Sequence, residues 1–258
     1  MRDVRPRVFL VAATEMIASG VYDYLTEIGA EGWTSNATSP PDLLAEFAGR
    51  LCYRSWKPGL NANVTKVREG NREYLANVIS QRHSSVFEHA SVSFIFHNVS
   101  RVFTHELVRH RVGVGISQES LRYVRLTDLG FWMPPAIAQH PEMGALARAV
   151  VEGLEGFQIK LANAFMLDDP GKDFALKKAL TSAMRRFAPL GLATGLLWTA
   201  NMRTLRHVIE QRTAPGAEEE IRLVFDEVAR LVTARYPATF QDFARQDDGA
   251  WTPTASKI

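Results

Sequence analysis

The segment ASVSFIFHNVSRVFTHELVRHR, residues 90–111, joins a strand pattern to a helix pattern through one serine. From Val92 to Phe96 every second position carries a large apolar side chain, which is the period of a β-strand with one buried face. Ser100 can cap a helix that continues to about Arg111, because a serine hydroxyl accepts a backbone N–H of the first helical turn. These residues predict a strand that leads directly into a helix.

The same order recurs later in the chain. The apolar run ATGLLWTA, residues 193–200, predicts a second strand, and Asn201 can cap a helix that continues through Thr213. Strands interspersed irregularly with helices predict one α+β domain over residues 1–258, with a small, mostly antiparallel sheet, long helices and a peripheral tail after about residue 241. The other predicted elements are a buried strand at 8–13, helices at 41–51, 67–82 and 217–236, two long helices between 142 and 186, and a loop at Gly113 and Gly115.

The composition is that of an ordinary globular protein. The 258 residues are 46% hydrophobic, and 30 Lys and Arg against 28 Asp and Glu give a formal charge of +2. These values exclude a disordered, collagen-like or disulfide-scaffold chain, and they leave only the local distribution of charge as a guide to partners. The sequence contains no apolar run of about 18 residues, so we expect no membrane span.

Cys52 is the single cysteine of the sequence, so no internal disulfide can form. A reducing cytoplasm is therefore the expected location. Arg50 and Arg54 could lower the pKa of its thiol, but Cys52 lies in a helical apolar pattern and has no paired base nearby in the sequence. We therefore expect a small buried residue rather than a reactive thiol.

Common catalytic motifs are absent from this sequence or incomplete in it. The segment GVG at 113–115 lacks the third glycine of a dinucleotide-binding fingerprint, and no phosphate-binding GxxxxGK[ST] loop occurs. The segment HELVR at 105–109 begins like the HExxH motif of zinc proteases, but its fifth position is an arginine. We therefore predict no metal site.

Residues 101–125 form an unusually basic part of the chain. Five arginines and two histidines stand here against two acids, Glu106 and Glu119. On charge alone, a solvated basic face, a nucleic-acid patch and an anion pocket are equally good interpretations. The neighbouring glycines and small hydroxyl residues favour a pocket, because they let the backbone approach a ligand closely. Arginine side chains would suit phosphate or carboxylate groups there.

A second polar cluster follows the second predicted strand. Asn201 can cap the next helix or offer its amide to a ligand. Arg203 and His207 are four positions apart and share one face of that helix, whereas Arg212 lies about half a turn from Arg203 at roughly 100° per residue. The helix therefore either presents polar groups to two different ligands or subunits, or is a surface helix with salt bridges, for example through Glu210.

Both clusters contain short sequence motifs, and a third motif lies upstream of them. The sequence RHR at 109–111 is followed by SLRY at 120–123, HSSVFEH lies upstream at 83–89, and NMR lies downstream at 201–203. Together with His207, Arg212 and the acidic stretch EEEIR that follows them, these motifs resemble those of the flavin-dependent thymidylate synthases. The resemblance covers about residues 7–245 in the same order.

The resemblance implies a homotetramer whose active sites lie between subunits. It implies reductive methylation of dUMP to dTMP, with methylenetetrahydrofolate as carbon donor, NADPH as reductant and FAD as redox cofactor. It also implies a route without an enzyme thiol, which agrees with the position of Cys52 outside every ligand motif. The expected partners are small molecules, with neither membrane nor nucleic acid.

The same resemblance assigns the site residues. Arg212 matches the arginine that acts on the uracil ring, where a guanidinium beside N3 and its carbonyl would stabilise negative charge on the base. Ser120 is expected to donate a hydrogen bond to the nucleotide phosphate, because no base is evident to activate it as a nucleophile. The residues implied for FAD are His83, Ser85, Arg109, His110, Arg111, Gln118, Asn201, Met202, Arg203 and His207. The residues implied for dUMP are Glu106, Leu107, Val108, Arg109, Gln118, Glu119, Ser120, Leu121, Arg122, Arg185 and Arg212.

Two departures from the family pattern bear on the substrate. Eight residues separate Arg111 from Ser120, one more than is usual, and the glycines within 112–116 could absorb the extra residue as a bulge. The position often held by glutamate falls on Gln118, with Glu119 displaced by one. These changes keep two alternatives open: a related flavoenzyme that acts on another nucleotide-like acceptor, and a non-catalytic nucleic-acid-binding protein that uses the basic stretch.

Overall fold

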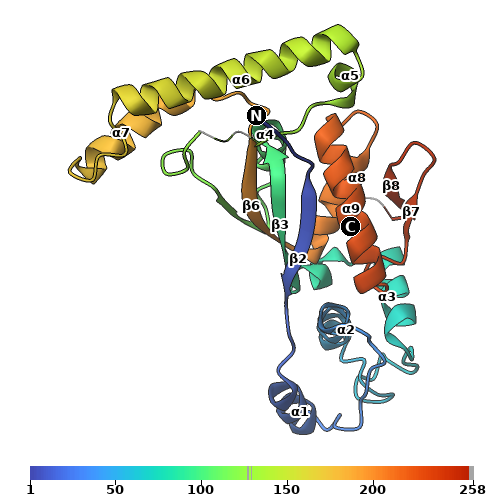
Figure 1. Ribbon diagram of the computed structural model, residues 1–258. Coiled ribbons are helices and arrows are strands. Elements are labelled where there is room, and N and C mark those ends of the chain that lie inside the picture. The colour runs from blue at the N-terminus through green and yellow to red at the C-terminus, as the bar shows by residue number, and fades with distance from the viewer. Residues whose placement is uncertain (127, 129, 256–258) are drawn as a thin grey trace.

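A four-stranded antiparallel sheet lies at the centre of the molecule (Figure 1). The computed structural model describes residues 1–126, 128 and 130–255. The sheet and the helices around it confirm the α+β prediction. Strand β3 is the one predicted from its periodicity, and β6 is the one predicted from its apolar run. The strands run in the order β2 (Arg7–Ala13), β3 (Ser91–Ser100), β6 (Ala193–Asn201) and β4 (Val114–Gln118).

One face of the sheet is covered by α8 (Met202–Thr213) and α9 (Glu219–Arg235) (Figure 1). Phe94 and Trp198 of the sheet are fully buried, and the ring of Phe225 in α9 lies 5.8 Å from that of Trp198. Burial of one large apolar side chain stabilises a fold by about 1.5–3 kcal/mol. This aromatic cluster therefore fixes α9, and with it α8, against the sheet.

Strand β2 corrects one prediction. Residues 8–13 do form a strand, but it lies at the edge of the sheet and is not buried as predicted. Val8 and Leu10 pack against the core, whereas Phe9 and Val11 are 38% and 48% exposed. Alternate side chains of a strand point to opposite faces of the sheet, so an apolar run does not by itself mean burial on both faces.

Cys52 is exposed, which corrects the prediction of a buried residue. It lies in the last turn of α2 (Pro40–Tyr53), between the exposed residues Leu51 and Tyr53. The buried side of this helix includes Glu46 and Arg50. A helix that buries only one face carries the apolar residues of its other face into solvent.

A helical arm extends away from the sheet (Figure 1). Its long helices, α6 (Pro141–Ala164) and α7 (Phe174–Met184), confirm the two predicted between 142 and 186. The short helix α5 (Pro135–Ala138) precedes them, and the 3-10 helix η2 (Arg185–Phe187) follows. No helix in the described part of the chain is both long and apolar enough to cross a membrane.

The other elements are shorter. Helix α4 (Arg101–Leu107) begins after Ser100 as predicted but ends before Arg111, and α3 (Asn71–Ser80) is shorter than the predicted 67–82. Helix α1 had no predicted counterpart. The stretch predicted as a peripheral tail after about residue 241 contains a hairpin instead, and Trp251 of this hairpin belongs to the main core, which corrects that prediction. The remaining elements are α1 (Ala18–Glu27), the 3-10 helix η1 (Ser84–Glu88), the parallel pair β1 (Arg2–Asp3) and β5 (Gly130–Phe131), and the hairpin β7 (Phe243–Arg245) and β8 (Trp251–Pro253).

Candidate functional site

The segment from Glu106 to Gly113 runs antiparallel alongside helix α8. At one end, Arg212 near the C-terminus of α8 contacts Glu106 and His110. At the other end, the backbone N–H of Asn201, at the start of α8, donates to the backbone oxygen of Gly113 over 2.9 Å. The RHR motif and the NMR helix, which are far apart in the sequence, therefore lie side by side.

All three guanidinium nitrogens of Arg212 are engaged within the chain. Nε donates to Nε2 of His110 over 2.7 Å, Nη1 donates to Oε2 of Glu106 over 2.7 Å, and Nη2 donates to the backbone oxygen of Glu106 over 2.8 Å. A guanidinium has five N–H donors, so two of them remain for a ligand. The side chain is 16% exposed, which leaves the group oriented and partly desolvated.

His110 is a neutral imidazole at neutral pH. Burial is the largest of the effects that together lower its pKa to about 4; the neighbouring charges of Arg212 and His207 act in the same direction, and Glu106 opposes them. Because Nε2 accepts from Arg212, the proton of the neutral ring lies on Nδ1. The ring of His207 is 5.9 Å away in a T-shaped arrangement, so two imidazoles and one guanidinium converge beside α8.

Gly113 forms the turn into β4 and corrects two predictions. Its φ is +69°, and a Cβ here would collide with Nδ2 of Asn201 and lie 2.7 Å from Oγ1 of Thr204, so this position requires glycine. Gly115, which with Gly113 was predicted to mark a loop, lies within β4 instead, and residues 114–118 pair with β6 in unbroken register. Residues 114–118 therefore contain no bulge, which corrects the prediction of one in this part of the segment.

Gln118 and Glu119 have different partners. Gln118, the last residue of β4, donates from Nε2 to Oγ1 of Thr104 over 3.3 Å. The Glu119 carboxylate accepts the backbone N–H of Gly195 over 2.9 Å and the hydroxyl of Thr194 over 3.4 Å. Glu119 is therefore bound to the start of β6, and it forms no ion pair with a described arginine.

The residues implied for FAD extend from α8 toward η1. Arg203 of α8 forms an ion pair with Glu88 at the end of η1. Nδ1 of His83 lies 3.3 Å from the hydroxyl of Tyr53, and Ser85 is exposed on η1. Arg203 and Arg212 thus meet different elements, as their spacing on the helix predicts.

Two of the implied residues point into the core. The side chains of Leu107 and Met202 are fully buried, so only their backbone groups could meet a ligand. The exposed members of the predicted set are Ser85, Val108, Arg109, Arg111, Glu119, Arg122, Arg185 and His207.

Arg185 belongs to a second group, around the loop that follows β4. Burial and the nearby charge of Arg185 lower the pKa of Arg101, and the charge of Glu119 opposes them. Nη2 of Arg101 donates to the backbone oxygen of Glu119 over 3.0 Å. In the same loop, Oγ of Ser120 accepts the backbone N–H of Arg122 over 3.3 Å. The residues implied by the resemblance do not include Arg101.

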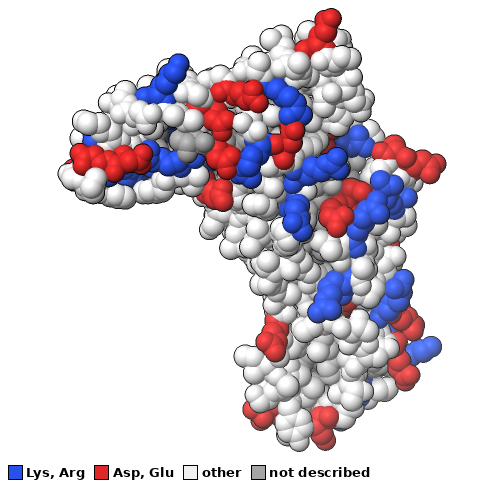
Figure 2. All heavy atoms as spheres, in the orientation of Figure 1, with Lys and Arg blue, Asp and Glu red and all other residues white. Residues whose placement is uncertain are grey.

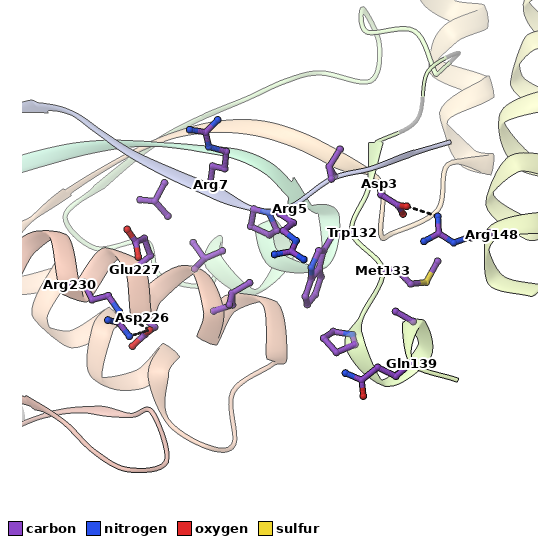
Figure 3. A pocket seen from close by; sticks show the side chains of 17 residues that line it. Asp3, Arg5, Arg7, Trp132, Met133, Gln139, Arg148, Asp226, Glu227 and Arg230 are labelled. Atoms are coloured by element: carbon purple, nitrogen blue, oxygen red, sulfur yellow. Dashed lines mark hydrogen bonds and ion pairs between the residues drawn. The ribbon is translucent and has the colours of Figure 1, made fainter. Parts of the chain in front are cut away.

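A cavity of about 1160 Å³ lies between β2, α9 and the arm (Figure 3). Its lining includes Arg5, Trp132 and the ion pair of Asp3 with Arg148, whose atoms are 2.6 Å apart. The described lining contains none of the residues implied for FAD or dUMP. The cavity and the Arg212 cluster are therefore separate features.

The chain matches known proteins over most of its length. A family described as "Thymidylate synthase complementing protein" matches residues 35–238. A flavin-dependent thymidylate synthase of Mycolicibacterium gilvum (strain PYR-GCK) is 36% identical over 266 aligned residues, which cover 100% of both chains. Enzymes of the same name from Mycobacteroides abscessus and Mycobacterium marinum are each 34% identical, over 94% and 98% of this chain and 92% and 97% of their own lengths. The chain therefore belongs to the family of flavin-dependent thymidylate synthases.

Proposed function

We propose that this protein converts dUMP to dTMP by reductive methylation, with methylenetetrahydrofolate as carbon donor and NADPH as reductant through bound FAD. The observation that carries the proposal is the guanidinium of Arg212, which Glu106 and His110 hold through three nitrogens. Family membership supports the reaction class. Residues 1–258 would form one catalytic domain with the fold of this family.

Arg212 would stabilise the charge that develops on the uracil ring. If its two free N–H groups meet N3 and a ring carbonyl, they place positive charge where electron density accumulates as C5 becomes nucleophilic. The contacts with His110 and Glu106 orient the group before the substrate arrives. A neutral His110 suits this role, because it accepts a hydrogen bond from Arg212 instead of repelling it.

The exposed polar groups beside α8 fit a flavin dinucleotide. Arg109 and Arg111 are exposed and form no ion pair with a described carboxylate, and arginine side chains suit a pyrophosphate. Asn201 caps α8 through Oδ1, so its amide nitrogen is directed elsewhere. A bound flavin supplies the hydride that completes the methyl group. The other proposed contacts are His83, Ser85, His110, Gln118, Arg203, His207 and the backbone of Met202.

The nucleotide would be held from two sides. Residues 106–109 adjoin Arg212 and would contact the base, with Leu107 contributing only its backbone. Residues 118–122, which end β4 and form the loop after it, would contact the sugar and phosphate together with Arg185. Ser120 in this loop would donate its hydroxyl to the phosphate.

We further propose a homotetramer with its active sites between subunits. Helix α6 exposes Leu146, Val150 and Phe157 at spacings that place them on one side of the helix. The outer face of the sheet exposes Ile95 and Leu197, which are direct partners in the pairing of β3 with β6. Exposed apolar faces of this kind mark protein–protein contacts.

The arrangement of charge supports small-molecule partners over nucleic acid. Side chains of the basic stretch, residues 101–125, contact different parts of the molecule. Arg125 pairs with Asp168 over 2.7 Å, and His110 accepts a hydrogen bond from Arg212. On the face shown in Figure 2, acidic and basic side chains lie side by side along the arm and over α9. A nucleic-acid site would present a continuous basic surface. We expect the enzyme in a reducing cytoplasm, because Cys52 is a free thiol.

The test is an anaerobic assay of the purified protein with FAD, NADPH, methylenetetrahydrofolate and dUMP, in which dTMP is detected by mass. We expect dTMP from the wild type and at least a roughly 100-fold loss of turnover in Arg212→Ala, with flavin content unchanged. Arg230→Ala is the matched control, because Arg230 is an α9 arginine paired with Asp226. NADPH oxidation without dTMP would overturn dUMP as the acceptor. Full activity of Arg212→Ala would overturn the role given to Arg212.

A further inference from the structure

The C-terminal hairpin of β7 and β8 packs against the end of α8 that carries Arg212 (Figure 1). Trp251 of the hairpin is buried in the main core. The match with the family ends at residue 238, so the hairpin lies outside the matched residues. Its own contacts with α8 therefore decide whether it bears on the site.

The first of these contacts is a hydrogen bond to Thr213, the last residue of α8. The backbone N–H of Trp251 donates to Oγ1 of Thr213 over 2.8 Å. The same hydroxyl donates to the backbone oxygen of Ile209 over 2.8 Å, one turn earlier in the helix. Thr213 is only 1% exposed, so water cannot take the place of either partner. Since Thr213 directly follows Arg212, the hairpin is bonded to the neighbour of the proposed catalytic residue.

Arg222 of α9 makes a second connection between α8 and the hairpin. Its Nε donates to the backbone oxygen of Thr213 over 3.4 Å, and its Nη2 donates to the backbone oxygen of Asp248 over 2.6 Å. Asp248 lies in the turn between β7 and β8. Carbonyl groups in the last turn of a helix have no partner within the helix, and Arg222 supplies a donor to one of them.

The hairpin is itself held on α9. Nε1 of Trp251 donates to Oδ1 of Asp226 over 2.8 Å, and Nε of Arg245 donates to the same oxygen over 2.7 Å. Asp226 belongs to α9, which packs against the sheet through Phe225. The hairpin therefore has a fixed position from which it holds the end of α8.

We infer that the C-terminal hairpin, through Thr213 and Arg222, positions Arg212 for the proposed reaction. The inference rests on the proposed function, in which Arg212 acts on the uracil ring. Helix ends open more easily than helix interiors, and Arg212 lies in the last turn of α8. A displacement of about 1 Å at a reacting group can cost up to about 100-fold in rate. Thr213 and Arg222 act through the backbone of α8, so they are positioning residues rather than catalytic ones.

The experiment compares Thr213→Val with the wild type in two measurements. Valine keeps the branched shape but cannot accept the N–H of Trp251. We expect turnover to fall roughly 10-fold with flavin content unchanged. In an NMR titration the pKa of His110 should rise, because the charge of Arg212 would move away from the ring.

Two further variants serve as controls. Thr213→Ser keeps the hydroxyl and should retain the wild-type turnover and the wild-type pKa of His110. Thr233→Val is the matched control, because the hydroxyl of Thr233 in α9 also donates to a carbonyl one turn earlier but is not bonded to the hairpin in the described part of the chain. It should change neither measurement.

Arg222→Met tests the second connection and keeps the inference falsifiable if Thr213→Val does not fold. Methionine fills similar space but donates no hydrogen bond, so we expect the same two changes. Lower stability with unchanged turnover and an unchanged pKa of His110 would mean that the hairpin only covers the core, and would overturn the inference.

The titration needs no turnover, so it separates this inference from the proposed function. A wild type that makes no dTMP would refute the proposed reaction. A raised pKa of His110 in Thr213→Val and Arg222→Met would still show that the hairpin holds Arg212 beside His110.

Discussion

The hydrogen bond from Nε of Arg212 to Nε2 of His110 requires a neutral imidazole. Burial is the largest of the effects that lower the pKa of His110, and the charges of Arg212 and His207 add to it. A proton on Nε2 would replace the hydrogen bond by repulsion between two cations. The orientation of the proposed catalytic guanidinium therefore depends on a histidine that stays neutral near pH 7.

We predict that His110 titrates with a pKa of about 4. A histidine in the unfolded chain titrates near 6.5. As the pH falls, the unfolded state therefore takes up a proton before the folded state does, and the free energy of unfolding decreases between about pH 6.5 and 4. Above about pH 6.5 His110 is neutral in both states, so its titration no longer changes the free energy of unfolding.

An NMR titration of the His110 ring measures this pKa directly. Arg212→Ala should raise the pKa, because it removes a neighbouring positive charge. A midpoint near 6.5 in the wild type would contradict the neutral-histidine interpretation of the site.

Helix α4 is short, and Glu220 of α9 anchors its first turn. The backbone N–H of Ser100 donates to Oε1 of Glu220 over 2.7 Å, and the Ser100 hydroxyl donates to the same carboxylate. Oγ of Ser100 also accepts the backbone N–H of Phe103 over 3.1 Å. A helix of seven residues has little stability of its own, so this anchor determines where α4 places Glu106 beside Arg212.

We predict that Glu220→Ala lowers the free energy of unfolding by about 2–3 kcal/mol, because it leaves two buried donors of Ser100 without an acceptor. Glu219→Ala, at the exposed neighbouring position, should change stability by less than about 0.5 kcal/mol. Urea denaturation of both variants measures the difference. Equal stability of the two variants would show that Glu220 does not anchor α4.

The turn before β4 gives a second prediction about an element. Gly113→Ala should destabilise the fold by about 1–3 kcal/mol, because alanine resists a φ of +69° and its Cβ would collide with Asn201. Gly115→Ala is the control, because a Cβ there would meet only Cβ of Thr199 at 3.8 Å, an ordinary contact. Thermal denaturation compares them. A Gly113→Ala variant as stable as the control would contradict the account of the turn.

The arm meets the body of the molecule through a small apolar cluster. Val151 of α6 packs there with Leu126 and Leu192. Other apolar residues of α6 remain in solvent in the single chain, and Leu146 and Val150 are 57% and 55% exposed. Surface of this kind is expected to be covered by a second subunit, which would also fix the position of the arm.

We predict that Val150→Asp shifts the protein from a tetramer to smaller species, because it places a charge in the proposed contact. Glu152→Lys, at an exposed position of the same helix about 200° from Val150 at roughly 100° per residue, should leave the assembly intact. Sedimentation velocity measures the masses. A wild type that sediments as a monomer, or a tetramer that tolerates Val150→Asp, would contradict the proposed assembly through α6.

Local patterns were sufficient for the elements that carry the site. Ser100 and Asn201 cap α4 and α8 as predicted, with hydrogen bonds to the N–H groups of Phe103 and Thr204. Local patterns did not predict the contacts of Glu119. Nothing among its neighbours in the sequence shows that its carboxylate accepts the backbone N–H of Gly195 at the start of β6. That contact depends on the pairing of two strands that are distant in the sequence.

The sequence by itself determined the order of the main helices and strands and the kinds of side chain at the site, because periodicity and capping involve neighbours within about four positions. The tertiary structure decided that Cys52 is exposed, that β2 is an edge strand, and that Arg212 binds His110 across 102 positions of the chain. Burial and long-range hydrogen bonds depend on which elements pack together in space. No pattern confined to one element specifies that packing.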